Sequence, residues 1–386
     1  MKILRKINKT PYYSYRIGKL PKGCQLCVKG EKTVLFVTGL CSRKPYCYFC
    51  PVSDRKLGRD VVYVNEWQTR SFKDLVTEVK LCSSKGMGIT GGDPLMNVER
   101  CVKYIKFVKK EFGKRFHVHL YTPLVLVNDE RLEKLFKAGL DEIRFHPNFD
   151  DSKLWENMKF AKRFDWDVGV EIPVVPGKEK EIFKLVDFIK NNVDFINLNE
   201  LEVADNKVNK LVKLGFSTKD CVSYAVKGSE KLAKELLEYC SRHTNLDAHY
   251  CSSKLKDKIQ LAERIKKRAR GVKRKFDKVT DEGMLVRGAV YLKRLVPSTG
   301  YRRKLENADK EKTVKELEGV KRKIEERFDV GKGLMDVDKE KLRILIDVKV
   351  LKRIKSFLGR NNLIGAIVEE YPTHDQTEIE IEFLSS

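Results

Sequence analysis

The sequence of 386 residues lacks an apolar stretch long enough to span a membrane. Its longest run without a charged residue is the 13 residues from Phe116 to Asn128, and Pro123 interrupts it, whereas a spanning helix needs about 18. The residues from Met1 to Lys6 carry charge with no apolar run behind them, so we expect no signal peptide. Internal repeats and low-complexity tracts are also lacking. These absences favour a cytoplasmic protein without a membrane anchor.

Acidic residues are the scarcer charged type. Asp and Glu number 55 against 79 Lys and Arg, which gives a net charge of +24 and favours polyanions or acidic partners. The charged share of 35%, led by Lys and Glu, is typical of proteins from very hot environments. An apolar share of 41% is enough for a core. The length predicts two or three domains, or one barrel with an appendage.

Strand-like and helix-like stretches alternate from residue 33 to residue 251. The strand-like runs are mostly continuously apolar, as expected for a parallel sheet that is covered on both faces. This pattern predicts an α/β fold, a partial or full (β/α) barrel, followed by a small C-terminal α+β domain. The predicted parts are an N-terminal extension (1–32), the barrel (33–251), a basic helical linker (252–279) and the α+β domain (280–386).

Three cysteines directly follow the first predicted barrel strand, in Cys41-Ser-Arg-Lys-Pro-Tyr-Cys47-Tyr-Phe-Cys50. Barrels place their active sites at this carboxyl end of the strands. Three thiolates can hold three irons of a [4Fe–4S] cube and leave the fourth iron open for a ligand. Zinc is the alternative, and it would require a fourth ligand, which Cys24 or Cys27 could supply.

A glycine-rich turn, Gly91-Gly92-Asp93-Pro94, follows the second predicted strand. Two glycines let the backbone approach a ligand closely, and the Asp93 carboxylate could pair with an ammonium group. Taken alone, such a turn is better explained by a structural role. Because the turn and the cysteine triplet follow consecutive strands, a ligand site formed by both motifs is the more specific interpretation.

Together these motifs resemble the radical S-adenosylmethionine (SAM) enzymes, in an archaeal-looking branch related to pyruvate formate-lyase activating enzyme. The resemblance covers residues 33–250. The family usually has three residues between its first two cluster cysteines, whereas five separate Cys41 from Cys47. Phe49 matches the aromatic residue that packs near the adenine. Gly91-Gly92-Asp93-Pro94 matches the Gly-Gly-Glu-Pro motif that grips the amino group of SAM, with an Asp one methylene shorter than the Glu.

The resemblance implies a mechanism and its cofactors. A [4Fe–4S] cluster held by Cys41, Cys47 and Cys50 would bind SAM and cleave it reductively to a 5′-deoxyadenosyl radical, which takes a hydrogen atom from a substrate. Such an enzyme needs a low-potential electron donor of the ferredoxin or flavodoxin type. The resemblance does not reach the C-terminal domain and names no substrate.

Several predicted strands carry polar side chains at alternate positions, which share one face of a strand. They are predicted to line a polar cavity inside the barrel, with a hydrogen-bonded structural network as the alternative. Arg144 would suit the SAM carboxylate, and Glu171 would suit a ribose hydroxyl or a substrate amine. The set comprises His117, His119, Tyr121, Arg144, His146 and Glu171.

A second metal site is a further hypothesis. The pair Cys24-X-X-Cys27 has the spacing of a metal knuckle, and Cys240-X-X-His243 offers a matching pair for zinc. The alternatives are an auxiliary iron–sulfur cluster on Cys24, Cys27 and Cys251, with Cys240 or a histidine, and no metal at all.

Positive charge concentrates near the predicted linker: residues 254–275 carry 11 − 2 = +9, and residues 251–330 carry 25 − 13 = +12. This segment is interpreted as an RNA-binding arm or as a solvated helix of a basic protein. Three functions stay open: a radical SAM enzyme acting on RNA or an acidic protein, one acting on a small metabolite, and a zinc-dependent RNA-binding protein without catalysis.

Overall fold

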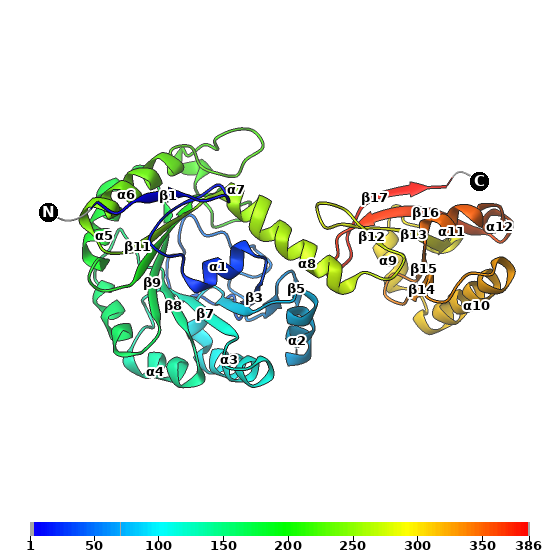
Figure 1. The fold of residues 1–386 in the computed structure, drawn as a ribbon, viewed down its shortest axis with the longest axis horizontal. Helices are drawn as coiled ribbons and strands as arrows, with labels where there is room; N and C mark the ends of the chain where they lie inside the picture. The colour runs from blue at the N-terminus through cyan, green and yellow to red at the C-terminus, as the bar shows by residue number, and fades with distance from the viewer. Residues whose placement is uncertain (1–3, 70, 385–386) are drawn as a thin grey trace. The chain divides into compact units, whose positions relative to one another are not determined.

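The computed structural model describes residues 4–69 and 71–384 and divides into two compact units, 1–264 and 265–386 (Figure 1). This division falls within the predicted linker 252–279. The four-part division itself stays a prediction, and its first and last segments extend beyond the described residues. None of the described helices is long and apolar enough to cross a membrane.

The first unit is built on a sheet with the strand order β1-β2-β11-β10-β9-β8-β7-β6-β3-β4-β5. The seven strands from β11 to β3 pair in parallel, while β1–β2 and β4–β5 add antiparallel pairs at the two ends. The sheet therefore curves as a partial barrel (Figure 1). Its strands are β1 (Ile7–Lys9), β2 (Tyr15–Ile17), β3 (Lys32–Phe36), β4 (Tyr63–Val64), β5 (Trp67–Gln68), β6 (Gly86–Thr90), β7 (His117–Thr122), β8 (Glu142–Phe145), β9 (Asp167–Val174), β10 (Phe195–Glu200) and β11 (Asp247–Cys251).

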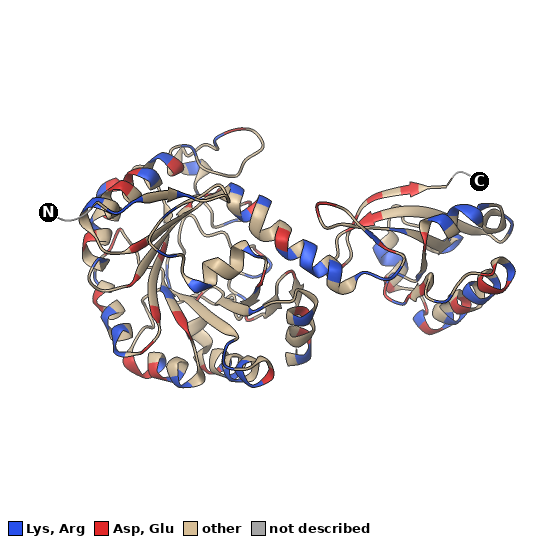
Figure 2. Cartoon of the chain, in the orientation of Figure 1, with Lys and Arg blue, Asp and Glu red and all other residues tan. Residues whose placement is uncertain are grey.

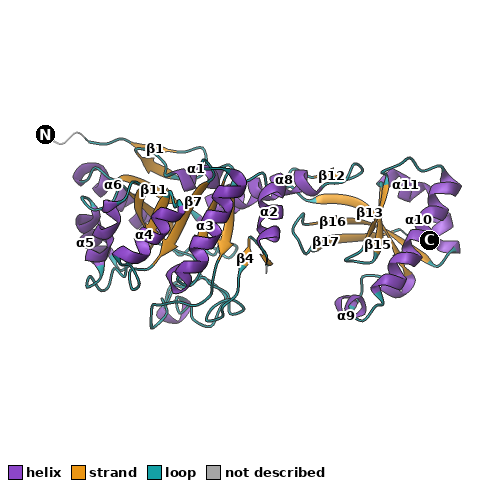
Figure 3. Ribbon diagram, turned by 90° about the horizontal axis from the view of Figure 1, so that it is seen from below, coloured by secondary structure: helices purple, strands orange, loops and turns teal. Residues whose placement is uncertain are grey.

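Helices cover the outer face of the curved sheet (Figure 3). The ends of these helices are set by capping residues. The Ser71 side chain caps the start of α2 (Phe72–Leu81), Asn128 caps the start of α4 (Asp129–Ala138), and Gly139 ends α4 in a left-handed conformation. The helices of this unit are α1 (Lys22–Val28), α2 (Phe72–Leu81), α3 (Val98–Phe112), α4 (Asp129–Ala138), α5 (Glu179–Ile189), α6 (Ser229–His243), α7 (Ser253–Leu255) and α8 (Ala262–Val272), which runs across the division between the units.

The two faces of the parallel strands differ in chemistry. Outward residues such as Val118, Leu120 and Ile143 join the apolar core beneath the helices. Inward residues include His119 and Arg144, which are also buried. Because strand side chains alternate between faces, one apolar and one polar set arise from the same strands.

Helix α1 lies within the curve of the strands and contacts β3, β6 and β7 (Figure 1). The Gly23 N–H donates to the Glu142 carboxylate at 3.1 Å. The sequence predicted only an extension with a cysteine pair here, because seven residues are too few for a clear helical period. The extension therefore supplies part of the barrel interior.

The second unit is the predicted α+β domain. Its antiparallel sheet has the order β14-β15-β13-β16-β17, and β12 pairs with β13. Side chains of β13 alternate between two apolar clusters, with Val290 on one face and Tyr291 on the other. Its elements are β12 (Lys278–Val279), β13 (Leu285–Leu292), α9 (Tyr301–Glu306), α10 (Lys310–Phe328), β14 (Met335–Asp338), β15 (Arg343–Ile346), α11 (Val348–Arg353), α12 (Lys355–Arg360), β16 (Leu363–Glu370) and β17 (Glu378–Phe383).

The predicted basic helix is helical but not uniform. It runs as α7, a π-helical stretch at Lys256–Leu261, and α8, and Lys and Arg dominate its charged positions (Figure 2). The predicted fold class, an α/β partial barrel with a small α+β domain, is confirmed.

We predict that Gly23→Ala destabilises the first unit. A β-carbon on Gly23 would lie 2.6 Å from Arg144 Nη2 and 2.8 Å from the His119 ring, so the variant should lose about 1–3 kcal/mol of unfolding free energy, measured by urea denaturation. Gly319→Ala is the control, because nothing lies within 4 Å of its added methyl group in α10. An unchanged stability of Gly23→Ala would contradict the close packing of α1.

Candidate active site

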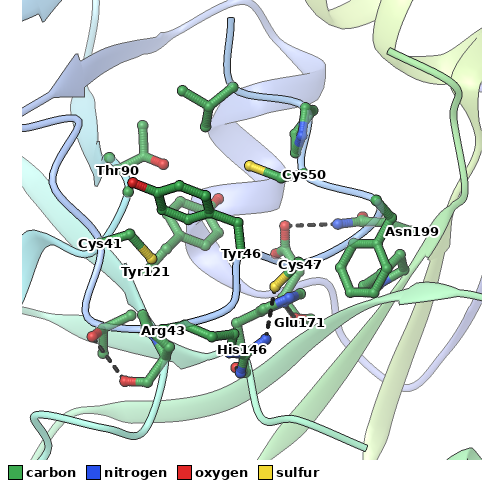
Figure 4. Close-up of a pocket in the computed structure, with 18 of the residues that line it drawn as sticks. Cys41, Arg43, Tyr46, Cys47, Cys50, Thr90, Tyr121, His146, Glu171 and Asn199 are labelled. Carbon is green, nitrogen blue, oxygen red and sulfur yellow. Dashed lines mark hydrogen bonds between the residues drawn. The ribbon is translucent and has the colours of Figure 1, made fainter. Parts of the chain in front are cut away.

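The three motif cysteines lie on the loop between β3 and β4, at the carboxyl end of the parallel strands. Cys41, Cys47 and Cys50 all line one cavity of about 370 Å³ (Figure 4). The cavity wall also includes residues from the ends of β6, β7, β8, β9 and β10. The structure therefore brings the triplet to the end of the barrel where the sequence placed the chemistry.

Cys47 differs from the other two thiols in its surroundings. Burial raises its pKa, but the neighbouring His146 and Arg43 side chains outweigh burial and lower the pKa to about 7. Burial raises the pKa of Cys41 and of Cys50 above the ordinary value. Cys47 is thus the thiol of the triplet that ionises most readily, and a thiolate is the form that binds metal.

Gly91 and Gly92 line the cavity, and they also pack against the chain that leads to Cys41. A β-carbon on Gly91 would lie 2.4 Å from the Thr38 carbonyl oxygen, and one on Gly92 would lie 2.4 Å from the Leu40 carbonyl oxygen. The Gly92 N–H donates to the Thr38 carbonyl at 2.9 Å. Glycine is required here for strand-end packing, in addition to any approach of a ligand.

Asp93 lies behind the cavity wall. Its side chain is fully buried, and neither Asp93 nor Pro94 lines the cavity. One carboxylate oxygen accepts hydrogen bonds from Thr122 Oγ1 at 2.8 Å and from the Leu95 N–H at 3.0 Å, and the other accepts from Ser42 Oγ at 2.5 Å. Both oxygens are therefore engaged by the protein, instead of facing a ligand ammonium group as the motif implied.

Arg144 and Glu171 both line the cavity, but they are bound to each other. Arg144 Nη1 donates to Glu171 Oε2 at 2.8 Å, and the rest of its guanidinium pairs with Glu142. Burial raises the pKa of Glu171, but the Arg144 charge and two Asn hydrogen bonds outweigh it and lower the pKa. The guanidinium that was predicted to meet the SAM carboxylate is thus already paired with two protein carboxylates.

Phe49 lines the cavity beside the cysteines, as the motif implied. Its ring contacts His146 edge-on at 5.9 Å between centroids and stacks on Phe149 at 6.1 Å. These contacts hold an apolar face at the cavity, a surface that suits an adenine ring.

The residues of the predicted second metal site are not gathered. Cys24 lies inside the barrel, where its sulfur accepts from Arg144 at 3.4 Å and from Asn197 at 3.3 Å. Cys240 lies on the outer helix α6 in the apolar core, and the ring of His243 contacts that of Tyr239 in a tilted arrangement, with 4.5 Å between centroids. The helix that carries Cys240 and the helix that carries Cys24 therefore lie on opposite faces of the sheet.

The structure also places Cys251, which belonged to the alternative iron–sulfur hypothesis, and a group of possible metal ligands that the sequence did not predict. Cys251 packs beside Val28 of α1, near the Cys24–Cys27 pair. Among the described residues, the group of metal-type ligands whose donor atoms all lie within 4.8 Å is His117, His119 and Glu142. Glu142 already accepts from Arg144 and from the Gly23 N–H, so this group is explained as part of the buried ion-pair network.

Some cavity residues were not predicted. Asn199 donates to Glu171 Oε1 at 3.0 Å, and Asn197 donates to Glu171 Oε2 at 2.9 Å; their alternation along β10 was a visible signal of a shared face. Arg43 and Lys256 carried no such signal. Arg43 is a spacer residue, and Lys256 belongs to the predicted linker, so only the folded chain brings them to the cavity.

The long loop after β10 holds the cysteine loop in place. Asn206 Nδ2 donates to the Cys50 carbonyl at 2.9 Å, and the Lys210 N–H donates to the Tyr48 carbonyl at 2.7 Å. The same loop exposes apolar side chains to solvent. They are Val212, Leu214, Val222 and Tyr224.

Comparison with known proteins gives a family and relatives. Residues 35–168 match the sequence model of the Radical SAM superfamily. A curated protein of Methanocaldococcus jannaschii, provisionally named as a glycyl-radical enzyme activating enzyme, is 38% identical over 382 residues and covers 96% of this chain and 94% of its own.

Two solved structures are similar to part of this chain at low identity. SuiB of Streptococcus suis, bound to the precursor peptide SuiA, is 15% identical with a TM-score of 0.41, over 58% of this chain and 48% of that one. Methylornithine synthase is 17% identical with a TM-score of 0.37, over 55% of this chain and 62% of that one. The chain thus matches about half the length of the first of these structures.

We predict that Asp93→Ala lowers the unfolding free energy of the first unit by about 3 kcal/mol, because Ser42, Thr122 and the Leu95 N–H lose a buried acceptor. Asp93→Asn should lose less, since one acceptor oxygen remains. Urea denaturation measures both. Asp205→Ala, at an exposed position of the same unit, should change stability by less than about 0.5 kcal/mol, and equal stability of all three variants would refute the role of Asp93.

We also predict a loss of stability at acid pH that depends on His249. Burial is the main reason that its pKa falls to about 4. Because the folded pKa lies below that of the unfolded chain, the unfolded state takes up the proton first as pH falls. The contribution of the neutral ring to the unfolding free energy is therefore complete above about pH 6.5. About 3 kcal/mol of that free energy is lost as the pH approaches 4.

The variant His249→Gln should flatten the dependence of unfolding free energy on pH between 7 and 4, measured by urea denaturation at several pH values. A slope equal to that of the wild type would show that other groups cause the acid sensitivity.

Proposed function

The chain belongs to the radical SAM superfamily, and we propose that it binds its [4Fe–4S] cluster through Cys41, Cys47 and Cys50 and cleaves SAM in the cavity beside them. The family match and the archaeal relative confirm the resemblance that the motifs predicted. The observation that carries the proposal is the convergence of the three thiols on one cavity at the carboxyl ends of the strands.

The thiols fit the cluster chemically. They come from a single loop, they line the same cavity, and one of them ionises near pH 7. The cluster supplies the electron that cleaves the sulfonium of SAM to methionine and a 5′-deoxyadenosyl radical. Cys41, Cys47 and Cys50 would bind three irons of the cluster, and the residues lining the cavity would orient SAM and keep bulk water away.

The SAM contacts are assigned to residues that line the cavity. Phe49 offers an apolar ring face, and the backbone of Gly91 and Gly92 approaches the cavity without side chains. Asp93 and Pro94 support that backbone from behind. Glu171 is ionised and held by Asn197, Asn199 and Arg144, so it presents a fixed negative charge to a ribose hydroxyl or an amine. Arg144 then acts by holding Glu171.

We propose a polypeptide as the substrate, with hydrogen abstracted from a backbone Cα. The name of the relative that matches 96% of this chain supports this class. The exposed apolar side chains on the loop after β10 also support it, because that loop is bonded to the cysteine loop and gives a protein a surface to contact near the cavity.

We infer the electron donor and the second candidate substrate from the positive charge of the chain. With a net charge of +24, the chain favours an acidic low-potential donor of the ferredoxin or flavodoxin type. We also propose that the protein works in the cytoplasm, where such donors are found. RNA is the second candidate substrate, favoured by the net charge of +12 in residues 251–330.

The cluster assignment is tested by anaerobic reconstitution of the full chain, followed by assays of iron, sulfide and 5′-deoxyadenosine with dithionite and SAM. We expect about four irons per wild-type chain and product from SAM. The triple variant Cys41/Cys47/Cys50→Ala should lose both, whereas Cys24/Cys27→Ala should retain both. A triple variant that keeps iron and activity would refute the assignment, and iron loss in the double variant would favour the auxiliary cluster.

The substrate class is tested by isotope transfer. Glycine-containing peptides deuterated at Cα should pass deuterium into 5′-deoxyadenosine, measured by mass spectrometry. Label transfer from peptide supports the polypeptide substrate. Stimulation of SAM cleavage by RNA, with no transfer from peptide, would favour the second candidate.

A further inference from the structure

The five-residue spacer between Cys41 and Cys47 contains an arginine that is bound to a cysteine sulfur. Arg43 Nη1 donates to Cys47 Sγ at 3.0 Å, and Nη2 donates to the His146 carbonyl oxygen at 2.7 Å. One guanidinium therefore joins the cysteine loop to the residue that follows β8. The spacer folds back on the second cysteine of the motif (Figure 4).

The guanidinium is aimed at sulfur without a competing carboxylate. Within the described ranges, the hydrogen-bond acceptors of Arg43 are Cys47 Sγ and a carbonyl oxygen, and no ion pair of Arg43 is found there. A guanidinium hydrogen bond to a neutral thiol is weak, whereas one to an anionic sulfur is charge-assisted. The geometry therefore suits a sulfur that carries negative charge, as a metal-bound thiolate does.

His146 orients the arginine through its backbone, and its ring is bound elsewhere. Its Nδ1 lies 2.8 Å from the Glu171 carbonyl oxygen, which can only accept, so that nitrogen donates to the carbonyl. Within the described ranges, the side-chain hydrogen bond found to a sulfur of the triplet is that of Arg43 to Cys47. The charged donor thus acts on one of the three sulfurs.

We propose that Arg43 is a positioning residue that raises the reduction potential of the cluster through its hydrogen bond to Cys47. This inference rests on the proposed function, because it assumes that Cys47 holds an iron. Reduction adds negative charge to the cluster, and a cationic donor on a ligand sulfur stabilises the reduced form more than the oxidised form.

The bond to the His146 carbonyl gives the arginine its direction. Nη2 is held by the carbonyl of His146, the residue after β8, and Nη1 donates to Cys47 Sγ, so the positive charge lies beside that sulfur. The five-residue spacer supplies the length that this fold-back requires, which gives the unusual spacing a physical role.

The test is an EPR-monitored redox titration of the anaerobically reconstituted full chain. Arg43→Met removes both donors and the charge, and its midpoint potential should shift to a more negative value. Arg43→Gln keeps a neutral N–H donor and should shift less. Arg55→Met is the matched control, because Arg55 is an exposed arginine later on the same loop and forms no hydrogen bond to a cysteine within the described ranges; its midpoint should equal that of the wild type.

A spectroscopic readout separates this role from a purely structural one. In D₂O, pulsed EPR of the reduced wild-type cluster should detect a strongly coupled exchangeable deuteron, and Arg43→Met should lose it. A merely structural arginine would leave the coupling unchanged.

The outcomes distinguish the two proposals. A wild-type protein that holds no cluster refutes the proposed function and this inference with it. A wild-type cluster whose midpoint is the same in Arg43→Met refutes the inference alone. If Arg43→Met holds no cluster, Arg43→Gln decides, and an unshifted midpoint in that variant refutes the inference.

Discussion

The buried carboxylate of Asp93 is the interaction on which the site depends. It accepts hydrogen bonds from Ser42 after β3, from the Leu95 N–H after β6 and from Thr122 at the end of β7. Three consecutive parallel strands are thereby held together at their carboxyl ends. Burial raises the pKa of this carboxyl group, so the bonds must offset a real desolvation cost. This one group therefore ties the start of the cysteine loop to the glycine turn, alongside the backbone bonds between the same two segments.

A second constraint lies deeper in the barrel. Arg144 is buried between Glu142 and Glu171, and the three charges compensate one another only in part, leaving one net negative charge among them. Glu142 also binds the N–H of Gly23, so the ion pairs hold α1 inside the curve of the strands. Glu171 and Arg144 at the same time line the cavity. The floor of the candidate site and the attachment of the N-terminal segment are therefore one network.

The two units carry different features of the protein. The first carries the cavity, the thiols and the loop that binds the cysteine segment. The second has its own apolar clusters on both faces of an antiparallel sheet. Its buried Arg287 belongs to the basic stretch 251–330 and pairs with Asp277 and Glu370, so part of the positive charge that suggested nucleic-acid binding is compensated within the fold. Net charge alone did not distinguish a buried, paired arginine from an exposed one.

The sequence by itself determined the fold class, the family, and the strand ends where chemistry gathers, because apolar runs, helical periods and the spacing Cys41–Cys47–Cys50 are local properties of the chain. It could not place Cys24 inside the barrel and Cys240 outside it, since two pairs with the same spacing look alike until the sheet separates them. It could not show that Asp93 faces inward, that Arg144 is already paired, or that Arg43 reaches a sulfur. Each of these polar groups had several possible partners in the sequence. Only the tertiary structure decided which partner each one contacts, because that depends on which residues distant in the chain meet at the same strand ends.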